Sequence, residues 1–436
     1  MHYAWLVLAA STLAVFGCLG LARFGYGLIL PSMQDGLGLD NTGAGSLATA
    51  GLVGYALLSI LGGVLAAHFG PRVVVALGLG AAGVGMFLTG LSETLWTALV
   101  FQFIAGMGSG ASNVPVMGLL SAWFGPKRRG FAAGVAVTGS SLALIALGPL
   151  VPWILERFSE DGWRVCWYLF GVVTVGLALF SYVILRNDPS EKGMRPLGLG
   201  EDELMPGDPT AEGAGAGEKD AVGPVGRGGR MGRPSWSSVY KSGAVWHLGF
   251  VYIAFGFSYI IYMTFFAKHL IDAGGYSTSG AGTLYMVMGW FSLLCGVLWG
   301  AISDRVGRGR ALAGVYAVHA IAFGLFAVWP APVGFTLSAV LFGLSAWSIP
   351  AIMAATCGDV VGHRMAPAAL GFITLFFAVG QTIGPIAAGA LADAAGTLHP
   401  VYLLAAVAAL GGVLGAVTLR SEKPSRSASL TEPSRG

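Results

Sequence analysis

Long apolar stretches alternate with short polar segments along almost the whole chain. A helix needs about 20 apolar residues to cross a bilayer. We predict twelve such helices, at residues 4–31, 44–67, 73–91, 95–122, 131–155, 163–185, 246–268, 279–302, 311–329, 333–357, 367–394 and 400–419. Hydrophobic residues make up 55% of the 436 residues and charged residues only 10%, against about 25% charged in soluble domains. The pattern therefore predicts an all-α membrane protein.

One polar interval, residues 186–245, is much longer than the others and is rich in Gly, Pro and charged residues. Such a segment cannot bury a core, so we expect a flexible linker. It separates a predicted six-helix bundle at residues 1–185 from a second bundle at 246–420, followed by a tail at 421–436. Most of the 24 lysines and arginines fall in the linker, the tail and the loops on the same side. This bias predicts that linker, tail and both termini are cytoplasmic, and the Ala- and Gly-rich composition favours a bacterial inner membrane.

The two predicted bundles carry matching landmarks about 236 residues apart. The matched features are Pro115 and Pro350, the pairs Gly148-Pro149 and Gly384-Pro385, and the segments 63–72 and 300–309. An internal repeat in an apolar chain is typical of secondary transporters, which bind substrate between their two halves. The sequence thus predicts two pseudo-symmetric halves around a central site.

The segment from Gly300 to Arg310, GAISDRVGRGR, resembles the G-x-x-x-D-R-x-G-R-x-[KR] loop of the major facilitator superfamily. The first copy departs from that motif, because Ala67 and His68 stand where Asp and Arg are usual. The Gly-Pro pairs resemble the superfamily's fifth- and eleventh-helix motif. The loop at 123–130 and the stretch FSYIIYMTFF resemble its monocarboxylate and oxalate/formate-type branches. The resemblance covers essentially the whole chain and implies a transporter that works by alternating access, not an enzyme.

Arg23 is the one Lys or Arg that we place deep within a predicted span. A cation near the bilayer centre costs about 2.5–3.5 kcal/mol on insertion scales, so it normally faces a partner or a watery cavity. A guanidinium binds a carboxylate through two parallel hydrogen bonds. We therefore expect Arg23 to bind an anionic substrate. The alternative is a structural role, in which Arg23 caps backbone carbonyls or extends to the membrane surface.

Other polar or aromatic residues within the spans are candidates for the same site. Tyrosines can line a half-wet pocket and donate to a carboxylate, although each could equally pack a helix face or bond to a neighbouring helix. The candidates are Tyr26, Asn113, Tyr259, Tyr262, Trp347 and Gln381. Gln102 stands where many proton-coupled exporters of the superfamily carry Arg, which argues against their mechanism here.

Charges in two loops predict a gate on the cytoplasmic side. The loop with Asp304, Arg305 and Arg308 belongs to the second repeat, and the basic run Lys127, Arg128 and Arg129 belongs to the first. We hypothesise that Asp304 holds this side shut by pairing with the basic loop or with the start of the fifth span. The alternative is that Asp304 only caps its own loop.

The sequence favours a carrier for a small organic anion, with a monocarboxylate as the preferred guest because only one cation is available. The alternative on the same fold is an exporter of hydrophobic or drug-like compounds. No acidic residue falls convincingly in mid-membrane, and His319 is the one inner titrating candidate. A proton or a counter-anion is therefore a candidate co-substrate. We expect no catalytic residues, cofactor, metal or nucleic acid, and a monomer surrounded by lipid.

Overall fold

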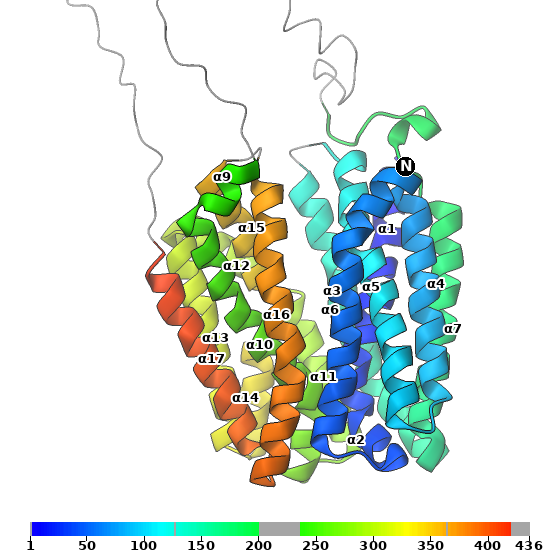
Figure 1. Cartoon of the computed structure of the whole chain (residues 1–436), viewed down its shortest axis with the longest axis vertical. Helices are drawn as coiled ribbons and strands as arrows, with labels where there is room; N and C mark the ends of the chain where they lie inside the picture. Colours follow the sequence, from blue (N-terminus) through cyan, green and yellow to red (C-terminus); the bar gives the residue numbers. More distant parts are fainter. Residues whose placement is uncertain (1, 126–127, 200–235, 363–364, 420–436) are drawn as a thin grey trace, which may run out of the picture.

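The computed structural model describes residues 2–125, 128–199, 236–362 and 365–419, and these fold into a bundle of long helices (Figure 1). The prediction of an all-α fold is confirmed. The helices are α1 (Ala4–Val15), η1 (Phe16–Phe24), α2 (Gly25–Leu37), α3 (Asn41–Phe69), α4 (Pro71–Gly90), α5 (Leu95–Trp123), α6 (Arg129–Phe158), η2 (Ser159–Asp161), α7 (Gly162–Ile184), η3 (Pro189–Lys192), α9 (Trp236–Lys241), α10 (Gly243–Asp272), α11 (Thr278–Ser292), α12 (Cys295–Val306), α13 (Arg308–Val328), α14 (Pro332–Gly343), α15 (Ser348–Val361), α16 (Ala366–Ala395) and α17 (His399–Val417).

Ten helices of the described ranges are long and apolar enough to cross a membrane, or eleven if the bent pair α11 and α12 is one span. The longest of the ten, Arg129–Ile184, contains both α6 and α7. These two helices form a hairpin, because the start of α6 and the end of α7 both lie beside the N-terminus. The Tyr3 hydroxyl donates to the carbonyl of Ile184 (2.7 Å), and the rings of Trp5 and Phe131 are 6.3 Å apart. Counting α6 and α7 separately gives the twelve predicted crossings.

The outer surface of the bundle is apolar. Large side chains such as Val64, Leu77 and Val297 are 69%, 69% and 79% exposed. Exposed apolar surface on this scale marks contact with a membrane or another protein. Together with the span lengths, it is the surface of an integral, multi-pass membrane protein.

Helices α1 to α7 form one half of the bundle and α10 to α17 the other (Figure 1). The repeat in the sequence reappears as repeated backbone geometry. Gly70 joins α3 to α4 with φ +85°, and Gly307 joins α12 to α13 with φ +92°. Residues with a side chain rarely adopt such positive φ values, so the glycine of the loop motif is needed at both places.

The predicted linker at 186–245 has ordered ends. Residues Pro189–Lys192 form a short 3₁₀ helix, and Leu197 forms a parallel β-bridge with Phe124 through backbone hydrogen bonds to Trp123 and Gly125. On the other side, α9 begins at Trp236 and α10 at Gly243. Residues 200–235 and the predicted tail at 421–436 lie outside the described residues, so the domain boundaries stay a prediction.

The two ends of the bundle differ in how the halves meet. We call the end with α9 and the start of α1 the linker end, and the end with residues 38–40 and 396–398 the far end. In the described ranges, the side-chain hydrogen bonds that join the halves involve N-terminal residues Arg23, Phe24, Asn41, Thr42, Thr49 and Ser141. These residues lie in the middle and at the far end. Among the described residues, the polar side-chain contacts that hold the halves together therefore lie in the middle of the bundle and at the far end.

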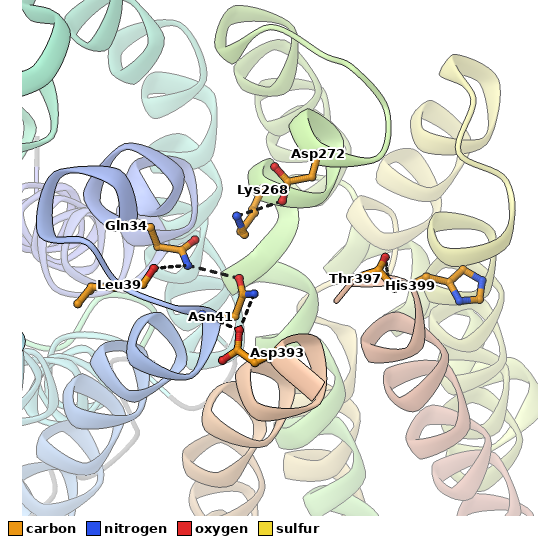
Figure 2. A network of polar contacts seen from close by, with 8 residues as sticks. All are labelled: Gln34, Leu39, Asn41, Lys268, Asp272, Asp393, Thr397 and His399. Carbon is orange, nitrogen blue, oxygen red and sulfur yellow. Dashed lines mark hydrogen bonds and ion pairs between the residues drawn. The ribbon is translucent and has the colours of Figure 1, made fainter. Parts of the chain in front are cut away.

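Asp393 makes the densest polar contact at the far end (Figure 2). Its carboxylate accepts from the backbone N and side-chain Nδ2 of Asn41 (3.0 and 2.8 Å). It also accepts from the backbone N and Oγ1 of Thr42 (2.8 and 2.6 Å). Asn41 and Thr42 are the first residues of α3, whereas Asp393 lies in the last turn of α16. One carboxylate of the C-terminal half therefore caps a helix of the N-terminal half.

Both Gly-Pro pairs lie where the halves touch. A Cβ on Gly148 of α6 would come within 2.6 Å of the carbonyl oxygen of Gly282 in α11. A Cβ on Gly45 of α3 would come within 2.2 Å of the carbonyl oxygen of Pro385 in α16. Such close backbone approach requires small residues, which explains why glycines recur at this interface.

Candidate functional site

Arg23 lies near the end of η1, a nine-residue π-helical segment inside the first crossing. A π-helix has more residues per turn than the flanking α-helices and is frequent at functional sites. From this position the guanidinium crosses to the C-terminal half, where it donates to the hydroxyl of Tyr259 and to Oε1 of Gln381. The Tyr259 hydroxyl in turn donates to Gln381 Oε1 (3.3 Å). Three of the predicted site residues thus form one cluster, although 236 and 358 residues separate Arg23 from its two partners.

The charge of Arg23 has no acidic partner among the described residues, whose ion pairs involve Arg164, Lys268 and Arg308. Its Nε atom is buried and makes no hydrogen bond. Aromatic rings provide the remaining contacts, since the guanidinium carbon lies 5.2 Å from the ring centre of Tyr55 and 5.6 Å from that of Tyr259. Ring faces attract a cation, but they do not neutralise it. The site therefore keeps a net positive charge between the two halves.

A cavity of about 40 Å³ adjoins Arg23. Helices of both halves line it: Ala22, Arg23, Tyr26, Ala48, Gly51, Leu52, Tyr55, Gln102, Gly106, Ser109, Ile260 and Thr264. A cavity needs roughly 10–15 Å³ to hold a water molecule, so this one has room for roughly three water-sized groups. A small ligand fits beside the arginine, and a larger one would need the halves to move.

The other predicted site residues occupy different places. Tyr26 lines the cavity, but its hydroxyl donates to the carbonyl of Ala44 (2.7 Å). Asn113 does not line the cavity itself, but its side-chain amide donates to the hydroxyl of Tyr55, which does (2.9 Å). Trp347 lies between the halves, with its ring 5.1 Å from that of Phe24.

Tyr262 is separated from the cluster. It is fully buried inside the C-terminal half, where its hydroxyl pairs with Ser338 Oγ (2.8 Å) and its ring contacts four phenylalanines. Tyr259 and Tyr262 are three residues apart, about 60° around the helix at 3.6 residues per turn. That rotation is enough to place one hydroxyl between the halves and the other in the core of one half.

Sequence reasoning overlooked Tyr55 and Thr264, and it considered Gln102 only as a missing arginine. All three line the cavity. Tyr55 lies in a glycine-rich part of α3, where Gly51 and Gly54 pack against the backbone of α5. A tyrosine next to glycines within an apolar span was the feature of the sequence that could have identified Tyr55 as a site residue.

The described gate residues lie at the linker end, and the bonds of Asp304, Arg308 and Arg129 stay within their own half. Arg308 binds Asp304 (2.7 Å) and Asp359 (3.3 Å), and the Arg129 Nε donates to the carbonyl of Phe124 (3.1 Å). Arg305 is exposed, and Lys127 lies outside the described residues. In this structure Asp304 is therefore a local partner of Arg308, and its role in closing the linker end stays a prediction.

Two halves of long apolar helices, related by an internal repeat and meeting around a buried cation, define the class of secondary transporters. The family comparison agrees. The family model described as "Major Facilitator Superfamily" matches residues 12–366, with a second match at 249–435. The chain belongs to this superfamily, a family of transporters and not of enzymes, as the sequence motifs predicted.

Several curated relatives align over most of the chain at low identity. The "Probable sulfoacetate transporter" of Cupriavidus necator is 25% identical and covers 92% of this chain and 89% of its own length. The "Hexuronate transporter" of Bacillus subtilis is 23% identical, with 88% and 87% covered. "Monocarboxylate transporter 11" of Homo sapiens is 26% identical, with 94% and 81% covered.

Solved structures confirm the fold. The D-xylose-proton symporter aligns with a TM-score of 0.72 at 14% identity, covering 96% of this chain and 98% of its own. A bacterial homologue of the human lysosomal transporter Spinster, in an inward-facing and unoccupied conformation, aligns with a TM-score of 0.67 at 16% identity, covering 95% of both chains.

Proposed function

We propose that this transporter carries a small organic anion, with a monocarboxylate as the preferred guest, and that Arg23 binds its charged group. The observation that carries the proposal is the lone, unneutralised guanidinium between the halves. A buried cation is stabilised most by a carboxylate that takes two parallel hydrogen bonds. Tyr259 and Gln381 are neutral, so they leave the charge for the guest.

The contacts of Arg23 suggest how the guest could be coupled to movement. Arg23 belongs to the N-terminal half, and its two hydrogen-bond partners belong to the C-terminal half. In this structure these bonds connect the halves across the site. A carboxylate would compete with Tyr259 and Gln381 for the guanidinium, and would neutralise the charge before the halves change position. Such a mechanism suits exchange of one anion for another, or entry of an anion together with a proton.

The names of the relatives support the same substrate class, because sulfoacetate, hexuronate and monocarboxylates are all small organic anions. One cation at the site favours a single negative charge. The cavity beside Arg23, about 40 Å³ in this conformation, favours a body of only a few heavy atoms.

The orientation in the membrane is part of the proposal. Arg72, Arg129, Arg186 and the Arg308 loop lie at the linker end, whereas the far end carries Arg164 and Lys268. The positive-inside rule then places the linker end and both termini in the cytoplasm of a bacterial inner membrane. The structure would be open to the cytoplasm and closed to the outside. Reporter fusions at the two termini test this arrangement.

The test of function is uptake of a panel of radiolabelled carboxylates into proteoliposomes, with wild type beside Arg23→Gln. We expect saturable uptake of at least one acid, and its loss in Arg23→Gln. The matched control is Arg72→Gln, because Arg72 binds the carbonyl of Tyr182 (2.7 Å) at the linker end, away from the cavity. Uptake that survives Arg23→Gln would assign the arginine a structural role. Absence of carboxylate uptake by folded protein would instead favour an exporter of hydrophobic compounds.

A further inference from the structure

Most polar groups around the cavity are already committed to protein partners. The Tyr26 hydroxyl donates to the Ala44 carbonyl, and the Ser109 hydroxyl donates to the carbonyl of Cys18. The Tyr55 hydroxyl accepts from Asn113. Tyr26 and Ser109 therefore donate their hydroxyl protons to the protein, whereas the Tyr55 hydroxyl keeps a proton that it can donate.

Two further polar side chains of the wall, Gln102 and Thr264, make no hydrogen bond to any described residue. Gln102 is only 5% exposed, and its amide nitrogen is buried without a hydrogen-bond partner. Thr264 is 4% exposed, and no described residue shares a hydrogen bond with its hydroxyl. Leaving a buried donor unpaired is costly, and native structures rarely do so without a reason. The amide comes from the N-terminal half and the hydroxyl from the C-terminal half, and both line the same cavity as Arg23.

The helix directions place these two groups toward the far end of the cavity. Helix α5 begins at the far end, and Gln102 precedes Ser109 by about two turns. Helix α10 ends at the far end, and Thr264 follows Ile260 by about one turn. Both residues therefore lie on the closed side of the cavity. A guest whose charged group is held by Arg23 would have its other end enclosed there.

We propose that Gln102 and Thr264 determine specificity by binding an uncharged oxygen of the anion, a hydroxyl or keto group on the carbon next to the carboxylate. This inference rests on the proposed function, because it takes the charged group of the guest to be bound at Arg23. An amide and a hydroxyl can each both donate and accept, which suits a hydroxyl group best. The preferred guest is then a small hydroxy acid or keto acid, and the plain alkanoate of the same size is a poor one.

The test compares lactate with propionate, which differ by one hydroxyl group. Inhibition of uptake or direct calorimetric binding to purified protein gives the ratio of their affinities. We expect wild type to prefer lactate by roughly tenfold, the effect of about one buried hydrogen bond. Gln102→Leu should lower the affinity for lactate to that for propionate and leave the affinity for propionate unchanged. The matched control is Gln34→Leu, which removes an amide that binds Leu39 and Asn41 outside the cavity, and should keep the ratio.

A second pair of variants protects the test against misfolding. Thr264→Val should lower the lactate preference, whereas Thr264→Ser retains the hydroxyl and should restore it. Equal affinities in wild type, with binding still dependent on Arg23, would overturn this inference and leave the proposed function standing. Equal weakening of both acids by Gln102→Leu would also overturn it. If neither acid binds wild type and no other carboxylate does, the proposed function fails as well.

Discussion

The contact of Asp393 with the start of α3 should hold the far end closed, and Asp393→Asn should open it. The ionised carboxylate only accepts hydrogen bonds, and here it accepts two from Asn41 (Figure 2) and two from Thr42. An asparagine has one oxygen and an NH₂ group that donates. At most half of these bonds can survive, and the new NH₂ group faces donors.

The expected size of the effect follows from the bonds lost and the exposure of the site. A hydrogen bond to a charged group contributes about 1.5–3 kcal/mol when protected from water, and a carboxylate at a helix N-terminus adds about 0.3–1 kcal/mol. Asp393 is exposed, so solvent competes for the same groups and reduces both contributions. We expect a net loss of about 1–2 kcal/mol, which lowers the ratio of far-end-closed to far-end-open protein by roughly 5- to 30-fold.

Double electron–electron resonance gives the distribution of distances between two spin labels, and the populations in that distribution give this ratio. Leu91 and Trp329 are exposed, lie at the far end of opposite halves, and can carry the labels as cysteines. The four native cysteines are buried and are replaced first. In Asp393→Asn, a population with a longer distance between the labels should appear or grow.

The control is Asp272→Asn, which removes a far-end carboxylate that pairs with Lys268 of the same helix (3.0 Å). It changes the local charge equally but breaks no bond between the halves. An unchanged distance distribution in Asp393→Asn would refute the reasoning. If the distance distribution shifts equally in Asp393→Asn and Asp272→Asn, the effect comes from the loss of surface charge and not from the bonds between the halves.

Three further predictions follow from other contacts. Tyr262→Phe should lower the free energy of unfolding by about 1 kcal/mol, because the bond to Ser338 is lost, without changing the half-saturation of uptake; a changed half-saturation would place Tyr262 in the site after all. Gly106→Val should prevent folding, since a Cβ there would come within 1.9 Å of a backbone oxygen of α3; the peak of folded protein should then be missing in size-exclusion chromatography of the detergent-solubilised variant. Asp304→Asn should raise the reactivity of a cysteine at the linker end, and an unchanged reactivity would leave Asp304 as a local partner of Arg308.

The sequence alone predicted the class of fold because its signals are long and repeated. Every crossing must bury about 20 residues in hydrocarbon, so composition alone locates each helix to within a few residues. The matching landmarks then divide the chain into two halves. The remaining ambiguity was local: the structure extends the first crossing to Ala4–Leu37 and places a π-helix within it, which no pattern of apolar residues indicates.

The charge at the centre was also determined by sequence. Arg23 stands in an apolar stretch, and the cost of burying a cation there predicts a special environment without knowledge of its neighbours. Its partners Tyr259 and Gln381 were predicted as candidates, but so was Tyr262. Sequence offered no means of choosing between them, because a membrane helix is apolar on all sides and its pattern does not reveal which face is turned inward.

Tertiary structure decided how the helices are rotated and where the halves touch. It directs Tyr259 toward Arg23 and Tyr262 into the core, and it brings Gln102 and Thr264 to one cavity. It also sets Asp393 on the first turn of α3, about 350 residues away in the chain. Hydropathy fixes how deep a residue lies in the membrane, because the bilayer imposes that distance. Its neighbours depend on the packing of whole helices, which only the folded chain determines.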